Sequence, residues 1–201
     1  GIAVLDRNAV GTLPEMAAMR MESETVVVRP AAMADGIILA RVVLDFESEF
    51  VFKARIEEGL EEITAEFQKA RLPRRDRIAF QSVAPEVLEA YVRRNDVLVA
   101  TIDNRIVGYL CLDADAGLSC LRLCQGGVQP DQRRKGVGSA LAASAEMIAK
   151  KRGLRRITVA IQAKNEPAIA FIRKQGYVPG GYEEFYFPNL EIALFYSKMI
   201  R

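Results

Sequence analysis

The sequence predicts one α/β domain built on a mixed β-sheet. The chain has 201 residues, half of them apolar, which is enough to bury one core. Runs rich in β-branched residues alternate with segments of helical periodicity, and no internal repeat, low-complexity segment or linker divides the chain. The charge is ordinary for a globular protein, with 28 Lys and Arg against 26 Asp and Glu. This composition excludes disorder of the whole chain.

The elements expected in the first half are a strand and two helices. We expect residues 1–22 to form a loosely structured extension, without the long apolar stretch of a signal peptide. Residues 25–29 are β-branched and predict a strand. Residues 33–44 are apolar enough for a buried helix. Apolar residues spaced three or four apart predict a second helix over 54–70, ended by Pro73.

The second half predicts alternating strands and helices. The Gly126-Gly127 pair near the end of one expected strand indicates a bulge or a close backbone approach. Pro85 and Pro167 fit the first turns of helices, and Asn165 fits an N-cap. The elements expected in order are a helix over 85–94, a hairpin over 96–102 and 105–112, a strand over 118–128, a helix over 136–152, a strand over 155–161, a helix over 165–176, and two strands, one from 177 and one over 190–199.

The absence of histidine excludes several kinds of chemistry. Ser-His-Asp and Cys-His mechanisms and His-metal sites all need an imidazole, and the chain has none. Cys120 and Cys124 share one face of the expected strand about 13 Å apart, at roughly 3.3 Å per residue. That is too far for a disulfide or a chelate, so we expect no metal site. Three thiols, counting Cys111, suit a reducing cytoplasm.

Charge is divided unevenly along the chain. Residues 1–66 carry 13 acidic and 6 basic side chains, whereas residues 67–201 carry 13 acidic and 22 basic ones. A positive C-terminal half indicates an anionic ligand there. For the basic residues of 150–156, a solvated helix face is an equal alternative. Nucleic acid is a weaker one, because no aromatic residues are interleaved with the basic ones.

A helix start rich in glycine and positive charge predicts a pyrophosphate site. The segment 128–141 places Gly136 and Gly138 at the start of the helix, where unpaired N–H groups and the helix dipole attract anions. Glycine removes the Cβ atoms that would keep a phosphate away. The segment lacks the Gly-Lys-Ser/Thr of a P-loop, and Leu141 replaces the third glycine of a dinucleotide fingerprint. The alternative is a glycine-rich helix start with ordinary surface charge.

The motif Arg133-x-x-Gly136-x-Gly138, after Val128-Gln-Pro, resembles the acetyl-CoA signature of the GNAT superfamily of N-acetyltransferases. Residues 165–177 resemble the second half of that family's pattern, and residues 180–196 are similar to streptothricin acetyltransferases. The resemblance implies a GNAT-like mixed, mostly antiparallel sheet of six to seven strands flanked by helices, over residues 23–201.

The resemblance also implies how acetyl-CoA, the cosubstrate, would be bound. The gap between the strands 118–128 and 155–161 would admit it. Asn165 would bond near the pantetheine or thioester, or would only cap its helix. The other implied positions are the strand-edge backbone of Gly126, Gly127 and Val128, the pyrophosphate-binding amides of Arg133, Arg134, Lys135, Gly136, Val137, Gly138 and Ser139, and the CoA-facing Ala168, Phe171 and Lys174.

The sequence departs from the family pattern at its acid–base positions. Ile172 stands where the family has a tyrosine, and Cys124 and Gln125 stand where streptothricin-type relatives carry an acidic pair. Replacement groups could come from the segment that would close over the acceptor. Our candidates there are Glu184 and Tyr186, with Glu183 and Tyr182 as further options, and a surface or packing role is the alternative for each. Cys124 as a covalent acceptor is the weakest option.

The resemblance implies transfer of an acetyl group from acetyl-CoA to a primary amine by direct attack. The acceptor would be a small cationic amine, such as a streptothricin-like antibiotic in a resistance role, or a peptide amine. The acidic N-terminal half favours a cationic acceptor. A CoA-binding regulatory domain without turnover is the alternative. We expect a cytoplasmic monomer or homodimer without nucleic-acid or membrane partners.

Overall fold

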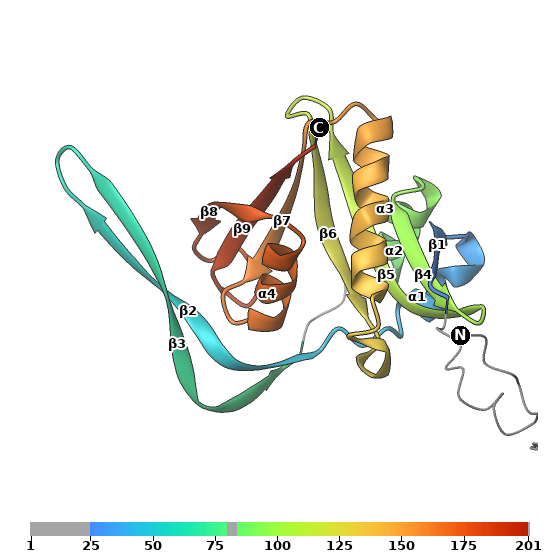
Figure 1. Ribbon diagram of the computed structural model, residues 1–201, viewed down its shortest axis with the longest axis horizontal. Helices are drawn as coiled ribbons and strands as arrows, with labels where there is room; N and C mark the ends of the chain where they lie inside the picture. The colour runs from blue at the N-terminus through green and yellow to red at the C-terminus, as the bar shows by residue number, and fades with distance from the viewer. Residues whose placement is uncertain (1–24, 80–83, 201) are drawn as a thin grey trace, which may run out of the picture.

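The computed structural model describes residues 25–79 and 84–200, so the extension expected over 1–22 lies outside the described residues. A seven-stranded sheet forms the body of the molecule, in the order β1-β4-β5-β6-β7-β9-β8 (Figure 1). All neighbouring strands are antiparallel except β6 and β7, which confirms the predicted fold class. The strands are β1 (Val27–Pro30), β4 (Val97–Ile102), β5 (Arg105–Asp115), β6 (Cys120–Val128), β7 (Arg156–Gln162), β8 (Val178–Glu183) and β9 (Ala193–Met199).

Helices cover both faces of the sheet. Successive residues of a strand point to opposite faces, and accordingly Leu98 and Ala100 pack in one apolar cluster while Val97 and Val99 pack in another. The first cluster takes the buried faces of the two C-terminal helices, and the second takes those of the N-terminal ones. The helices are α1 (Gly36–Leu39), α2 (Pro85–Arg93), α3 (Val137–Lys151) and α4 (Glu166–Lys174), with the 3₁₀ turns η2 (Met33–Asp35) and η3 (Pro130–Gln132).

The helix predicted over 54–70 is wrong: the chain there forms a two-stranded hairpin, β2 (Phe46–Glu58) and β3 (Ile63–Ile78). The spacing of the apolar residues resembles that of a helix because they come from two different strands on either side of a tight turn. A hydrogen bond from Gly59 N to Glu62 O (2.8 Å) closes that turn. Pro73 does not end the strand, because it lies in a bulge where residues 72–75 oppose Glu49. A proline in a bulge costs no ladder hydrogen bond.

The buried helix predicted over 33–44 is also wrong in extent. The helical residues are only the 3₁₀ turn η2 and the four-residue α1. Leu39 and Val42 are buried, but Ile37 is 72% exposed. Apolar composition alone therefore overestimated both the length of this helix and its burial. No helix in the described ranges is long and apolar enough to cross a membrane.

The strands β6 and β7 pair over a short stretch and then separate (Figure 1). The parallel ladder joins Cys120–Leu123 to Arg156–Val159. Both strands continue beyond it, β6 to Val128 and β7 to Gln162, without pairing to each other. The separation that the family resemblance implies for these two strands is therefore confirmed.

The Gly126-Gly127 pair lies along this gap, and its predicted close backbone approach is confirmed. A Cβ atom on Gly126 would lie 2.4 Å from the carbonyl oxygen of Tyr109, and one on Gly127 would lie 2.5 Å from Leu44 Cδ2. The bulge in the strand falls earlier, at Cys124, where the register with β5 shifts. Only glycine fits these two positions without displacing β5 or Leu44.

Candidate active site

The N-terminus of α3 offers backbone amides beside the β6–β7 gap. The first hydrogen bond of the helix runs from Ala140 N to Gly136 O (3.0 Å), so the amides of residues 137–139 have no partner within the helix. Gly136 caps the helix with a φ of +86°, and Arg134 has a φ of +67°. Such left-handed turns aim successive N–H groups at one point. No atom lies within 4 Å of a Cβ built on Gly136, so the space there is open.

The Arg133 side chain holds this turn in place. Its Nε donates to Val128 O (2.9 Å) and its Nη2 donates to Asp45 O (2.8 Å). Its guanidinium therefore adds positive charge to the helix start while its hydrogen bonds go to backbone carbonyls. Arg134 and Lys135 are exposed, and Lys135 donates to Gln132 Oε1 (2.9 Å). We call residues 133–139 the α3 cradle.

Helix α4 approaches the cradle from the other side of the gap. A Cβ on Gly138 would lie 3.2 Å from the Phe171 ring, and Gln175 Nε2 donates to Ser139 Oγ (3.1 Å). Glycine at 138 therefore lets the two helices meet. Lys174 is exposed at the end of α4, whereas Ala168 is half-buried against the core.

Asn165 caps α4, because its Oδ1 accepts a hydrogen bond from Ala168 N (3.1 Å). Of the two roles that the sequence left open for this residue, the capping role is the one seen in the structure. The side-chain nitrogen is not needed for the cap and can donate to a ligand.

The segment 43–52 connects the two sides of the gap. At one end, its carbonyl at Asp45 accepts from Arg133, and Leu44 contacts Gly127. At the other end, Phe52 N donates to Ala163 O (3.0 Å), just before α4. The start of β2 therefore passes from the cradle to the N-terminus of α4.

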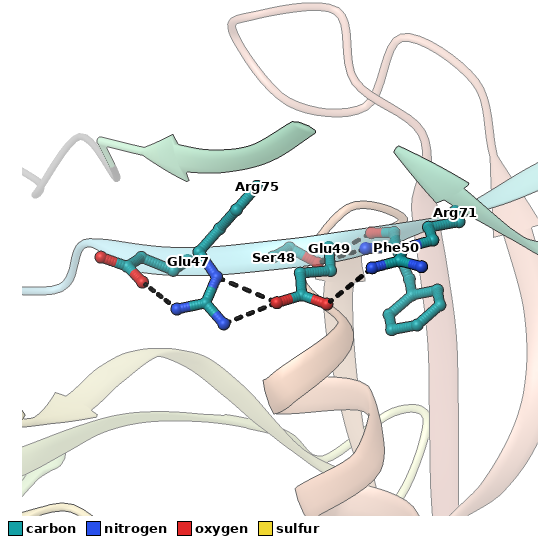
Figure 2. Close-up of polar contacts among 6 residues, drawn as sticks. All are labelled: Glu47, Ser48, Glu49, Phe50, Arg71 and Arg75. Atoms are coloured by element: carbon teal, nitrogen blue, oxygen red, sulfur yellow. Dashed lines mark hydrogen bonds and ion pairs between the residues drawn. The ribbon is translucent and has the colours of Figure 1, made fainter. Parts of the chain in front are cut away.

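An open cavity of about 290 Å³ lies where this segment meets α4. Figure 2 shows the polar contacts among the residues of β2 and β3 on its wall. Arg75, from the bulge of β3, donates to Glu49 (Nε–Oε1 3.0 Å) and lies 3.3 Å from Glu47 Oε2. Its hydrogen bond lowers the pKa of Glu49. Lys69 Nζ donates to Glu166 Oε1 (2.7 Å) and Arg71 lies 3.9 Å from Glu49, so each carboxylate at the cavity has a cation beside it. The residues that line the cavity are Glu47, Ser48, Glu49, Phe50, Arg75 and Glu166.

These residues do not follow from the sequence pattern, because most of them lie on the hairpin, part of which has the apolar spacing of a helix. Period-two alternation of Phe46, Ser48, Phe50 and Phe52 is the signal that could have found the strand.

The predicted acid–base candidates lie in and around the turn between β8 and β9. Glu183 ends β8 opposite Ala193, which in turn pairs with Gln162 at the end of β7. Glu184 is exposed. The Tyr186 ring packs edge-on against Phe195, with 5.3 Å between ring centroids.

Two neighbouring positions have mainly packing roles. The Tyr182 ring packs against Phe67 of β3, with 5.1 Å between ring centroids. Ile172 is buried in the core cluster and cannot donate a proton.

The thiols do not form a nucleophilic site. All three cysteines are free. Burial raises the pKa of Cys111 to about 12 and also raises the pKa of Cys124. Both are therefore protonated at neutral pH, which counts against Cys124 as a covalent acyl acceptor.

Comparison with known proteins agrees with this architecture. A nourseothricin acetyltransferase structure superposes with a TM-score of 0.73 at 20% identity, over 88% of this chain and 99% of that one. A Bacillus anthracis protein assigned as a streptothricin acetyltransferase, in complex with acetyl coenzyme A, gives 0.72 at 19% identity, over 87% and 99%. At these identities the likeness shows the fold.

Relatives in sequence match over a shorter stretch. Mycothiol acetyltransferase of Clavibacter sepedonicus is 29% identical over 106 residues, which is 52% of this chain and 34% of the relative. That of Clavibacter michiganensis is 31% identical over 81 residues, 40% of this chain and 26% of the relative. The match thus spans 34% and 26% of the length of these relatives. The model of the acetyltransferase (GNAT) family matches residues 57–177, and the chain therefore belongs to that family.

Proposed function

We propose that this protein transfers an acetyl group from acetyl-CoA to a primary amine. The observation that carries this proposal is the α3 cradle, whose amides precede the first helical hydrogen bond beside a gap between two separating strands. Anions bind at such helix starts without a dedicated cationic pocket. The GNAT family match, and the acetyl coenzyme A in the superposed Bacillus anthracis structure, support this choice of cosubstrate.

The residues around the gap fit the parts of the cosubstrate. The amides of Val137, Gly138 and Ser139 would hold the pyrophosphate, with charge from Arg134 and Lys135. The edge of Gly126–Val128 that faces away from β5 has no ladder partner in β7 and would take the pantetheine arm.

On the other side of the gap, the Asn165 side-chain nitrogen would donate near the thioester. Ala168, Phe171 and Lys174 would line the side that α4 presents.

When bound, the thioester supplies an activated acyl group, and the protein's task is to place an amine against it. Positioning alone can contribute about 7–11 kcal/mol. An alkyl amine has a pKa near 10.4, so it must lose a proton before attack. A general base there adds about 10²–10⁴-fold. We propose Glu184 or Tyr186 for this step, since they follow Glu183, whose strand partner Ala193 also pairs with Gln162 at the end of β7.

The departing thiolate needs no acid to be a tolerable leaving group, because a thiol has a pKa near 8.5. The buried Ile172 in place of the family's tyrosine therefore predicts a slower enzyme rather than an inactive one.

The cavity beside α4 offers carboxylates to a cationic acceptor. Glu47, Glu49 and Glu166 are paired there with Arg75, Arg71 and Lys69, so a protonated amine would bind by displacing one of these cations. A streptothricin-like antibiotic or a peptide amine both have this chemistry, and a role in antibiotic resistance would follow from the first.

Thermal unfolding with and without acetyl-CoA tests the cosubstrate. We expect acetyl-CoA to raise the melting temperature of the wild type and to leave Gly138→Glu unchanged, because the new side chain puts bulk and negative charge at the cradle. Ala143→Glu is the matched control, since it adds the same charge to an exposed position of α3. An equal shift in Gly138→Glu would contradict the proposal.

The buried Ile172 also favours one alternative, a CoA-binding regulatory domain without turnover. Thiol release measured across a panel of amines separates the two. Release with any amine supports the enzyme, and silence with every amine despite tight acetyl-CoA binding supports the regulatory domain.

A further inference from the structure

The β2–β3 hairpin extends well beyond the body of the protein (Figure 1). We call residues 46–55 with 68–78 its root and residues 56–67 its tip. At the root, Phe52 packs against the core and its backbone bonds to the residue before α4. The hairpin is the whole of its sheet, so each strand has one unpaired edge. A hairpin of two strands is at best marginally stable in water, so the tip needs further contacts.

One face of the hairpin carries apolar side chains from the root to the tip, among a few charged ones. Ala54 lies opposite Phe67, Ile56 opposite Ala65 and Glu58 opposite Ile63, and opposed residues share a face. Phe67 is covered by Tyr182. Farther out the face is uncovered, with Ile56 39% and Ile63 71% exposed and Leu60 at the turn fully exposed. The apolar surface therefore continues past the point where the body of the protein covers it.

Charge along the hairpin is separated by position. The tip carries five acidic residues and no basic one: Glu57, Glu58, Glu61, Glu62 and Glu66. The root carries seven basic residues and three acidic ones, a net charge of +4. Five of the seven basic residues already contact a carboxylate. Arg71 and Arg75 contact carboxylates of the root, whereas Arg55, Lys69 and Arg77 contact Glu57, Glu166 and Asp45. Arg71 nevertheless remains 77% exposed, and Arg74 is exposed.

We propose that the hairpin is a dimerisation arm that packs on the same arm of a second copy of this chain, with the tip of each arm along the root of the other. A two-fold axis repeats every contact, so each tip would meet the root of the other copy. This antiparallel arrangement covers the exposed apolar side chains of each tip. In two places it brings the five acidic residues of a tip beside the exposed basic residues of a root. The occupant is a second copy because both halves of the complementary pair lie on one hairpin.

Sedimentation of the full chain over about 1 to 100 µM tests the arm. We expect a dimer at the upper end that weakens as salt rises, because the charge pairs are exposed. Reversing the tip charges in Glu61→Lys/Glu62→Lys should raise the dissociation constant at least about tenfold, as should Arg71→Glu/Arg74→Glu at the root. Combining all four substitutions should restore it to within about threefold of wild type.

Lys150→Glu/Lys151→Glu, at the exposed end of α3, is the matched control and should leave dimerisation unchanged. The tip side chains are exposed, so their reversal should preserve the fold, which circular dichroism checks. A monomeric wild type at every concentration would overturn the proposal. A dimer that resists either reversal, or a fourfold variant that stays monomeric, would also overturn it.

Cross-linking gives a second measurement that does not depend on weakening a contact. In a Cys124→Ser background, Leu60→Cys chains mixed with Arg74→Cys chains should form disulfide-linked heterodimers, since the tip meets the root. Absence of this product, when both single variants remain folded, would contradict the arrangement.

Discussion

Replacing Arg133 should destabilise the protein even without a cosubstrate. Its guanidinium donates to Val128 O at 2.9 Å and to Asp45 O at 2.8 Å, and so joins the end of β6 to the start of β2. Hydrogen bonds from a charged donor contribute about 1.5–3 kcal/mol each. Because the side chain is half-buried, we take the lower end of that range and expect Arg133→Ala to cost about 3 kcal/mol in total. At a urea slope of about 2.5 kcal/mol per molar, the unfolding midpoint should fall by about 1.2 M.

The same substitution separates a structural role from a ligand role. Arg133→Lys keeps the charge but cannot reach both carbonyls with a planar guanidinium, so most of the stability loss should remain. Arg134→Ala removes an exposed charge from the same turn, and its free energy of unfolding should stay within about 0.5 kcal/mol of wild type. If Arg133→Ala unfolds at the wild-type midpoint and loses only affinity for acetyl-CoA, the structural role assigned to Arg133 is wrong.

Four other substitutions, at three positions, give further predictions. Asn165→Ala should lower the free energy of unfolding by about 1 kcal/mol, which urea unfolding measures. Asn165→Asp should keep the cap but lose turnover in a thiol-release assay, if the side-chain nitrogen contacts the thioester. Asp35 accepts hydrogen bonds from Arg29 (2.7 Å) and from Ala32 N, and the Arg29 hydrogen bond lowers the pKa of Asp35. Its stabilisation is therefore complete above its unfolded pKa near 3.9 and is lost as the pH falls through the folded value. Asp35→Asn should thus cost about 1.5 kcal/mol at pH 7, with the difference from wild type closing in acid unfolding curves below about pH 4. Cys124→Ser should leave turnover unchanged in the thiol-release assay. A large loss of turnover would support Cys124 as a covalent acyl acceptor.

The C-terminal half could be predicted because its signals are local and redundant. Asp103-Asn104 predicts a tight hairpin, and both residues adopt the positive φ that such a turn requires. Asn165 predicts a helix start, and its side chain is seen as the cap. The separation of β6 and β7 followed from the family resemblance, because neither strand shows in its own sequence where its partner leaves it.

The hairpin could not be predicted because its apolar pattern fits both one helix and two strands. Ile56, Leu60 and Ile63 are spaced as on one face of a helix, although the chain reverses direction between them. Tertiary contacts with Tyr182 and Ala163 decide the outcome, and these residues lie more than a hundred positions later. The cavity residues Glu47, Glu49 and Arg75 were missed for the same reason.

The short β6–β7 ladder divides the sheet into two half-sheets. The ladder that joins the two half-sheets has four residue pairs. Because this ladder is short, we expect the strands on either side of it to open as separate cooperative units. A ligand bonded along both facing edges would extend that connection past Leu123 and Val159. We therefore expect acetyl-CoA to slow deuterium exchange along residues 124–128 and to make the two half-sheets unfold together.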